Sequence, residues 1–287
     1  MGVERLVSIR RNVLSVLLVA AAIVGCQLPS AGAATQSASS HHVVATFSYR
    51  GSAAGSRDLR LVIRVDGVIR YDAPVVARFC GSTCSPDLFV SGRPVVHVVN
   101  FGPRNRRDVV LDLFSGGAHC CTIEQVFEYD LKTRTYLEFE HDFGDPSAAL
   151  VDLARNGRYE FVSADDTFAY RFTDFAASGL PMEVVAFANH RFIDVTRRYR
   201  GLVADDARKW MRAFRGDATE HFSDSVGLVA AWAADEDLLG HGRLVHRFLV
   251  AQAAAGHLND GLGDIEPSGR AFVIALDHFL AKRGYLR

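Results

Sequence analysis

Between residues 43 and 200 the hydrophobic residues occur in short runs of β-branched and aromatic side chains, and turn-forming residues separate the runs. The clearest pair of runs, 61–65 and 68–71, flanks Asp66-Gly67, a dipeptide that accepts the positive φ angles of a type I′ hairpin turn. Many short strands with frequent turns indicate an antiparallel β domain. Further strands are expected at 43–49, 86–90, 94–100, 108–114, 123–129, 135–140, 148–152, 159–163, 168–172, 183–188 and 191–195, with a second tight turn at Asn189-His190.

After Gly201 the hydrophobic residues follow a period near 3.6 residues, which is typical of helices. Apolar residues from Val203 to Phe214 lie three or four positions apart and would form one face of a first helix. Three later segments combine helical periodicity with a glycine stop signal, so we expect about four helices. They are 224–239, which follows Ser223 and stops at Gly240, 242–255, which ends at Gly256, and 268–283, which starts at Ser268 and ends at Gly284.

This change of period predicts an α+β fold, with an antiparallel β-rich domain at 43–201 and a helical region at 202–287 packed on or beside it. A chain of 287 residues with 49% hydrophobic and 23% charged residues can bury a core and is not a disordered sequence. Proteins that bind nucleic acids usually carry an excess of positive charge, whereas the net charge of this chain is -1, so we expect no nucleic-acid partner.

The N-terminal segment has the pattern of an export signal, with arginines up to Arg11 followed by an apolar run at 13–24 that is too short to span a membrane. Two processing sites compete. Ile23-Val24-Gly25-Cys26 resembles the bacterial lipobox, which would place a lipid anchor on Cys26, whereas cleavage near Ala33 would release a secreted protein. We favour the lipoprotein because Cys26 directly follows the apolar run. Residues 1–25 are then the signal peptide and residues 26–42 a flexible tether.

Four of the five cysteines remain for the mature domain: Cys80, Cys84, Cys120 and Cys121. An even number of cysteines in an exported chain indicates disulfides. The bridges could join the two segments or close locally as Cys80–Cys84 and Cys120–Cys121. We favour bridges between the segments because a longer loop restricts the unfolded chain more.

His119 precedes the second cysteine pair, and with the thiols it could form a zinc or redox site. Neither cysteine segment has Cys-x-x-Cys spacing, so we expect structural disulfides and a hydrogen-bonded loop histidine instead.

A weak internal repeat lies within the β region. Phe101-Gly102 and Phe143-Gly144 each precede a charged loop that enters a hydrophobic strand, and a shift of 52 residues places Arg106 on Arg158. The region has room for about three such units, whereas closed propellers contain about four to eight blades. We therefore expect propeller-blade-like sheets without a complete propeller.

The Phe-Gly pairs and the loop Asp152-x-x-x-Asn156-Gly157-x-x-Glu160 resemble the FG-GAP (integrin α-type, VCBS-like) repeats of exported bacterial proteins, over about residues 100–200. In that family the loop binds calcium through several carboxylates. Here Ala154 stands where the second acidic ligand belongs, and calcium needs about six to eight oxygen ligands. We expect no cofactor beyond weak calcium binding at Asp152, Asn156 and Glu160, where a turn closed by backbone hydrogen bonds is the simpler structure.

The sequence favours a non-enzymatic function, because it contains no Gly-x-Ser-x-Gly elbow, no His-Glu-x-x-His motif and no phosphate-binding glycine loop. We expect an exported, envelope-anchored or secreted binding protein. Its partners would be the membrane, through a lipid on Cys26, and an envelope or extracellular protein or a glycan. The alternative is an extracytoplasmic hydrolase with its site between the β region and the helices.

Overall fold

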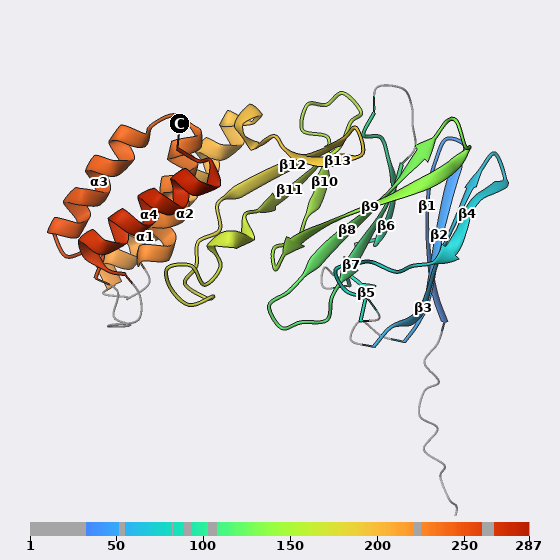
Figure 1. The fold of residues 1–287 in the computed structure, drawn as a ribbon, viewed down its shortest axis with the longest axis horizontal. Helices are drawn as coiled ribbons and strands as arrows, with labels where there is room; N and C mark the ends of the chain where they lie inside the picture. Colours follow the sequence, from blue (N-terminus) through green and yellow to red (C-terminus); the bar gives the residue numbers. More distant parts are fainter. Residues whose placement is uncertain are drawn as a thin grey trace, which may run out of the picture.

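The computed structural model describes residues 33–51, 55–81, 83–88, 93–102, 108–220, 225–259 and 267–286. The predicted signal peptide and Cys26 lie outside these residues. The α+β prediction is confirmed: three antiparallel sheets precede four helices. Figure 1 shows the sheets following one another along the long axis of the molecule, with the helices at one end and β1–β4 at the other.

The first sheet contains β1 (Ala33–Ser40), β2 (Val43–Arg50), β3 (Arg57–Val65) and β4 (Val68–Pro74) in chain order. The predicted hairpin turn is confirmed, because Asp66 and Gly67 have φ angles of 52° and 78° between the paired β3 and β4. The prediction of a flexible tether is wrong from Ala33 onward. Residues 33–40 form β1, an edge strand that pairs with β2 along its whole length.

The second and third sheets follow in chain order between the first sheet and the helices. The second sheet contains β5 (Ser85–Pro86), β6 (Val96–Val99), β7 (Asp108–Phe114), β8 (Thr122–Asp130) and β9 (Thr135–Gly144), and both β5 and β6 pair with β7. The third sheet contains β10 (Ala149–Val151), β11 (Glu160–Ala164), β12 (Met182–Ala188) and β13 (Arg191–Asp194) in chain order. The two repeat units thus correspond to two antiparallel meanders, β7–β9 and β11–β13.

The second sheet is buried on both faces. On one face Leu111 and Ile123 pack against the first sheet, and on the other Val110 and Val126 pack against Phe161 of the third sheet. This double burial explains why β7 and β8 consist almost entirely of buried residues.

The strand expected at 168–172 is wrong. The chain forms a 3-10 helix there, η1 (Asp166–Phe168), and then turns. Phe168 and Phe172 are each 2% exposed and pack into the helical core, so their hydrophobicity reflects burial against helices rather than a place in a sheet.

The helical region contains η2 (Thr196–Arg198), α1 (Arg200–Glu220), α2 (Ser225–Leu238), α3 (Gly242–Ala254) and α4 (Gly269–Arg283). The glycine stop signals are confirmed: Gly240, Gly256 and Gly284 follow the last three helices with φ angles of 88°, 78° and 81°. Trp232 of α2 lies 4.8 Å from the Phe248 ring of α3 and belongs to the helical core. Within the described part of the chain, no helix combines the length and the hydropathy needed to cross a membrane.

Candidate functional site

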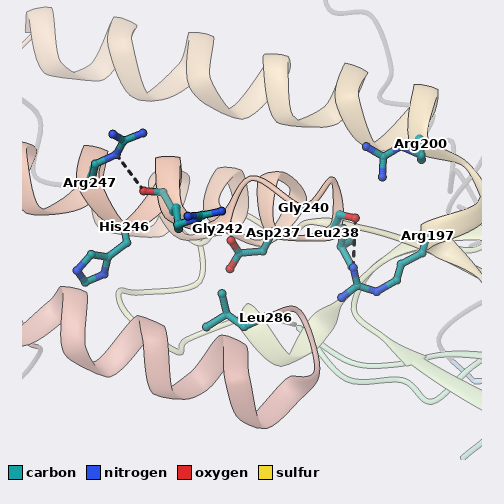
Figure 2. Close-up of a pocket in the computed structure, with 10 residues that line it drawn as sticks. Arg197, Arg200, Asp237, Leu238, Gly240, Gly242, His246, Arg247 and Leu286 are labelled. Carbon is teal, nitrogen blue, oxygen red and sulfur yellow. Dashed lines mark hydrogen bonds between the residues drawn. The ribbon is translucent and has the colours of Figure 1, made fainter.

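A pocket of about 880 Å³ lies where η2, the start of α1, the α2–α3 turn and the C-terminal segment meet. Figure 2 shows Asp237 near its centre, with His246 and Arg247 at one end and Arg197 and Arg200 at the other. The pocket is lined by Arg197, Arg200, Asp237, Leu238, Gly240, Gly242, Arg243, His246, Arg247 and Leu286.

Asp237, near the end of α2, is a buried carboxylate that points into this pocket (Figure 2). Its exposed fraction is 4%, and neither carboxylate oxygen has a hydrogen-bond partner among the described residues. Burial, the largest cause, acts with the negative charges of Asp277 and Glu236 to raise the pKa of Asp237 to about 7, against the lowering effect of Arg197. Asp237 is therefore an acceptor that the described part of the protein leaves without a donor.

Glycine at position 242 keeps the space beside Asp237 open. A Cβ atom at Gly242 would lie 3.1 Å from Oδ1 of Asp237 and 3.4 Å from Cδ2 of Leu286. Any larger residue at this first position of α3 would narrow the pocket between Asp237 and Leu286.

Arg197 and Arg200 are held in place by the carbonyl groups that the ends of α2 and α4 leave exposed. Arg197 donates hydrogen bonds to the carbonyl oxygens of Leu238 at 3.2 Å and of Gly284 and Tyr285 at 2.7 Å. Arg200 donates to the carbonyl oxygen of Leu239 at 2.8 Å. Cations are favourable at helix C-termini, so these contacts fix two positive charges at one end of the pocket.

The other end of the pocket is formed by the first turns of α3. Arg243 and Arg247 are exposed, and Nε of Arg247 donates to the carbonyl oxygen of Arg243 at 3.3 Å. Nδ1 of His246 lies 2.9 Å from Oδ2 of Asp277 on α4. With four arginines against one aspartate, the pocket has the charge and the planar hydrogen-bond donors to bind carboxylate or phosphate groups.

A second pocket, of about 280 Å³, lies between the third sheet and the helices. The Tyr285 hydroxyl donates a hydrogen bond to Oδ2 of Asp165 at 2.8 Å, and Arg283 lies 3.5 Å from Oδ1 of Asp165. Burial, the largest cause, acts with the charges of Asp165 and Asp194 to raise the pKa of Glu183 to about 7, against the lowering effect of Arg283. This pocket therefore combines a proton-holding carboxyl group with a second carboxylate.

The cysteines form local disulfides, Cys80–Cys84 and Cys120–Cys121, so our preference for bridges between the segments is wrong. A backbone turn brings the Cα atoms of Cys80 and Cys84 to 5.0 Å, within the range that a disulfide needs, and buries both residues in the hydrophobic core between the first and second sheets. Around the second pair, the backbone N–H of Cys121 donates to Oγ of Ser115 at 2.6 Å.

His119 lies beside two aromatic rings at the β7–β8 connection. Its ring centroid is 4.3 Å from that of Phe175 and 6.3 Å from that of Tyr170. Across the described ranges, no group of three or more histidine, cysteine, aspartate or glutamate residues is arranged to hold a metal ion.

The loop that resembles a calcium site is closed by its own backbone. Oδ1 and Oδ2 of Asp152 accept hydrogen bonds from the backbone N–H groups of Asn156 at 2.9 Å and Gly157 at 2.8 Å. Glu160 points elsewhere, because its Oε1 accepts a hydrogen bond from the Tyr199 hydroxyl at 2.8 Å. The structure thus places Asp152 and Asn156 in one turn and Glu160 at the junction with the helices, and weak calcium binding stays a prediction.

The residues of the basic pocket were not predicted from the sequence. One signal was available: Asp235, Glu236 and Asp237 follow an apolar stretch of α2, and buried charges in such a helix need an explanation. The arginines gave no signal, because they are far from Asp237 in sequence or resemble ordinary surface residues.

Comparison with known proteins gives one relative to report. The chain is 28% identical over 136 residues to a probable thylakoid lumen protein of Synechocystis sp., a match that covers 46% of this chain and 40% of that protein. The chain therefore spans about 40% of the length of the curated relative it matches. No family model matches the chain, and no solved structure matches it. A lumen is an extracytoplasmic compartment, so this likeness is compatible with an exported protein.

Proposed function

We propose that this chain is an exported binding protein whose basic pocket holds a small organic anion. The observation that carries the proposal is the cluster of four arginines around one pocket, of which Arg197 and Arg200 are oriented by backbone carbonyl groups. Side chains that are already fixed lose little freedom when a ligand binds, so such a pocket favours binding.

Export is supported by three independent features. The N-terminal segment resembles a signal peptide, the described cysteines form disulfides, and the relative described above is a probable thylakoid lumen protein. We further propose that Cys26 carries a lipid that anchors the chain to the envelope, with secretion after cleavage near Ala33 as the alternative. Relationship to the FG-GAP repeats remains part of this proposal, supported by the two successive meanders.

Titration calorimetry of the mature chain against glutarate, citrate and L-glutamate tests the binding function. We expect at least one of these anions to bind, and the double variant R243Q/R247Q to weaken that binding at least tenfold. The matched control is Arg215→Gln, an exposed arginine 15 residues further along α1 than Arg200, or about 22 Å at the rise of a helix. Absence of binding by all three anions at millimolar concentration would refute the proposal.

The second pocket favours the alternative function, a hydrolase with a site between the β region and the helices. The raised pKa of Glu183, about 7, suits a proton donor, and Asp165 supplies a nearby second carboxylate. Release of 4-nitrophenol from its esters, phosphates and glycosides is the assay. Turnover that Glu183→Gln abolishes would support the hydrolase, whereas equal turnover in the variant would exclude this pocket as its site.

A further inference from the structure

The unpaired carboxylate at the centre of the basic pocket narrows the class of ligand. A buried carboxylate without a partner is unfavourable, and in folded proteins it is normally paired with a cation or hydrogen-bonded. Within the described residues no hydrogen bond reaches either oxygen of Asp237.

Arg197 forms no hydrogen bond with the Asp237 carboxylate. Arg197 is close enough to lower the pKa of Asp237, but its guanidinium group donates to the carbonyl oxygens of Leu238, Gly284 and Tyr285. The other neighbours, Gly242 and Leu286, bring no polar side chain toward the carboxylate.

We infer that the pocket binds an amino acid with more than one acidic group, an inference that rests on the proposed function. The ammonium group of this ligand contacts Asp237, and its acidic groups contact the arginines. A ligand with acidic groups alone would leave Asp237 unpaired and repel it. A ligand with an ammonium group alone would be repelled by four arginines. Only a molecule that carries both kinds of charge pairs with Asp237 at the centre of the pocket and with the arginines at its two ends.

The arrangement of charges agrees with this ligand class. Figure 2 shows arginines at both ends of the pocket and Asp237 between them, so acidic groups on either side of an ammonium group find partners. A pocket of about 880 Å³ also leaves room for several carbon atoms between these groups.

Matched ligand pairs test the inference by titration calorimetry. Each amino acid is compared with the dicarboxylate that lacks only its ammonium group: L-aspartate with succinate, L-glutamate with glutarate, and L-2-aminoadipate with adipate. We expect at least one amino acid to bind tenfold or more tightly than its counterpart. Asp237→Asn should remove that preference while the dicarboxylate binds as before or more tightly, because the amide lacks the charge.

The control variant is Glu236→Gln, which removes a charge from the adjacent residue, whose carboxylate lies 2.5 Å from His241 outside the pocket. We expect this variant to keep the preference, and circular dichroism to show that both variants are folded. Equal affinity within every pair, or a preference that survives Asp237→Asn, overturns the inference and leaves the proposed function standing. Failure of all amino acids and all dicarboxylates to bind overturns both.

Discussion

Replacement of Asp235 by asparagine should stabilise the helical region at neutral pH. Asp235 lies on α2 with an exposed fraction of 0%. Burial, the largest cause, acts with Asp206 on α1 and with the charge of Glu236 to raise the pKa of Asp235 to about 9, against the lowering effect of Lys209. The folded protein therefore holds this carboxyl group in its neutral form at pH 7. Asparagine has nearly the same shape and never ionises.

The size of the effect follows from the difference between the folded and unfolded pKa. The unfolded chain releases the Asp235 proton near the ordinary value of 3.8, so folding at pH 7 must take up a proton. Each pH unit above 3.8 costs about 1.4 kcal/mol until the folded pKa is reached, which amounts to about 4 kcal/mol at pH 7. The stability contributed by neutral Asp235 is complete below pH 3.8 and is lost as the pH rises toward 9.

Urea unfolding followed by tryptophan fluorescence measures this difference. Both tryptophans of the chain, Trp210 and Trp232, lie in α1 and α2, so the signal reports on the helical region. We expect Asp235→Asn to raise the free energy of unfolding by about 1–4 kcal/mol at pH 7 and to have little effect at pH 4.

Asp205→Asn is the matched control, because Asp205 is an exposed residue of α1 paired with Arg208 and should change stability by less than about 0.5 kcal/mol. An Asp235→Asn variant that is less stable than the native chain at pH 7, or whose advantage is the same at pH 4 and pH 7, would show that Asp235 is ionised in the folded protein. The reasoning from burial would then be refuted.

Four further predictions concern the pocket and the cysteines. Because the pKa of Asp237 is about 7, its ionised fraction falls about tenfold between pH 8 and pH 6. The ratio of the affinities for the amino acid and for its matching dicarboxylate should therefore also fall about tenfold when calorimetry is repeated at these pH values. Gly242→Val should weaken ligand binding at least fivefold in the same assay, since its side chain narrows the pocket, and unchanged affinity would contradict the geometry. Peptide mapping of the non-reduced protein should find Cys120 and Cys121 linked to each other, and a peptide that joins them to another segment would disprove local pairing. Mass spectrometry of the mature N-terminus should find lipidated Cys26, whereas an unmodified terminus at Ala34 would establish cleavage and secretion.

The features that the sequence predicted well are those that a few neighbouring residues determine. Asp66-Gly67 forms the expected turn because both residues accept positive φ angles, whatever the rest of the chain does. Gly284 ends α4 for the same local reason, with its backbone N–H bonded to the last turn of the helix. Hydrophobic runs were less reliable: Phe168 and Phe172 look like part of a strand, but their burial depends on helices more than 25 residues away.

The candidate site could not be predicted because it exists only where distant segments meet. Asp237 is buried by contacts with the α2–α3 turn and the C-terminal segment, and Arg197 reaches the pocket from the end of the third sheet. The prediction of the cysteine pairing was wrong for a related reason. A disulfide that closes a longer loop removes more entropy from the unfolded chain, but the native backbone brings Cys80 and Cys84 together within a turn.

The two buried carboxylates of α2 have different roles because they leave the helix in different directions. Residues two apart on a helix point about 200° from each other, so Asp235 faces α1 while Asp237 faces the pocket. Beside Asp235 lies Asp206, whose Oδ2 accepts hydrogen bonds from the backbone N–H of Met182 and from Nε1 of Trp210, which ties that pair into the helical core. Neither oxygen of Asp235 or of Asp237 has a hydrogen-bond partner among the described residues, but only Asp237 lines the pocket, where its unpaired carboxylate is unfavourable. A ligand that supplies the missing donor removes this unfavourable term, and the same contact gives the pocket its selectivity.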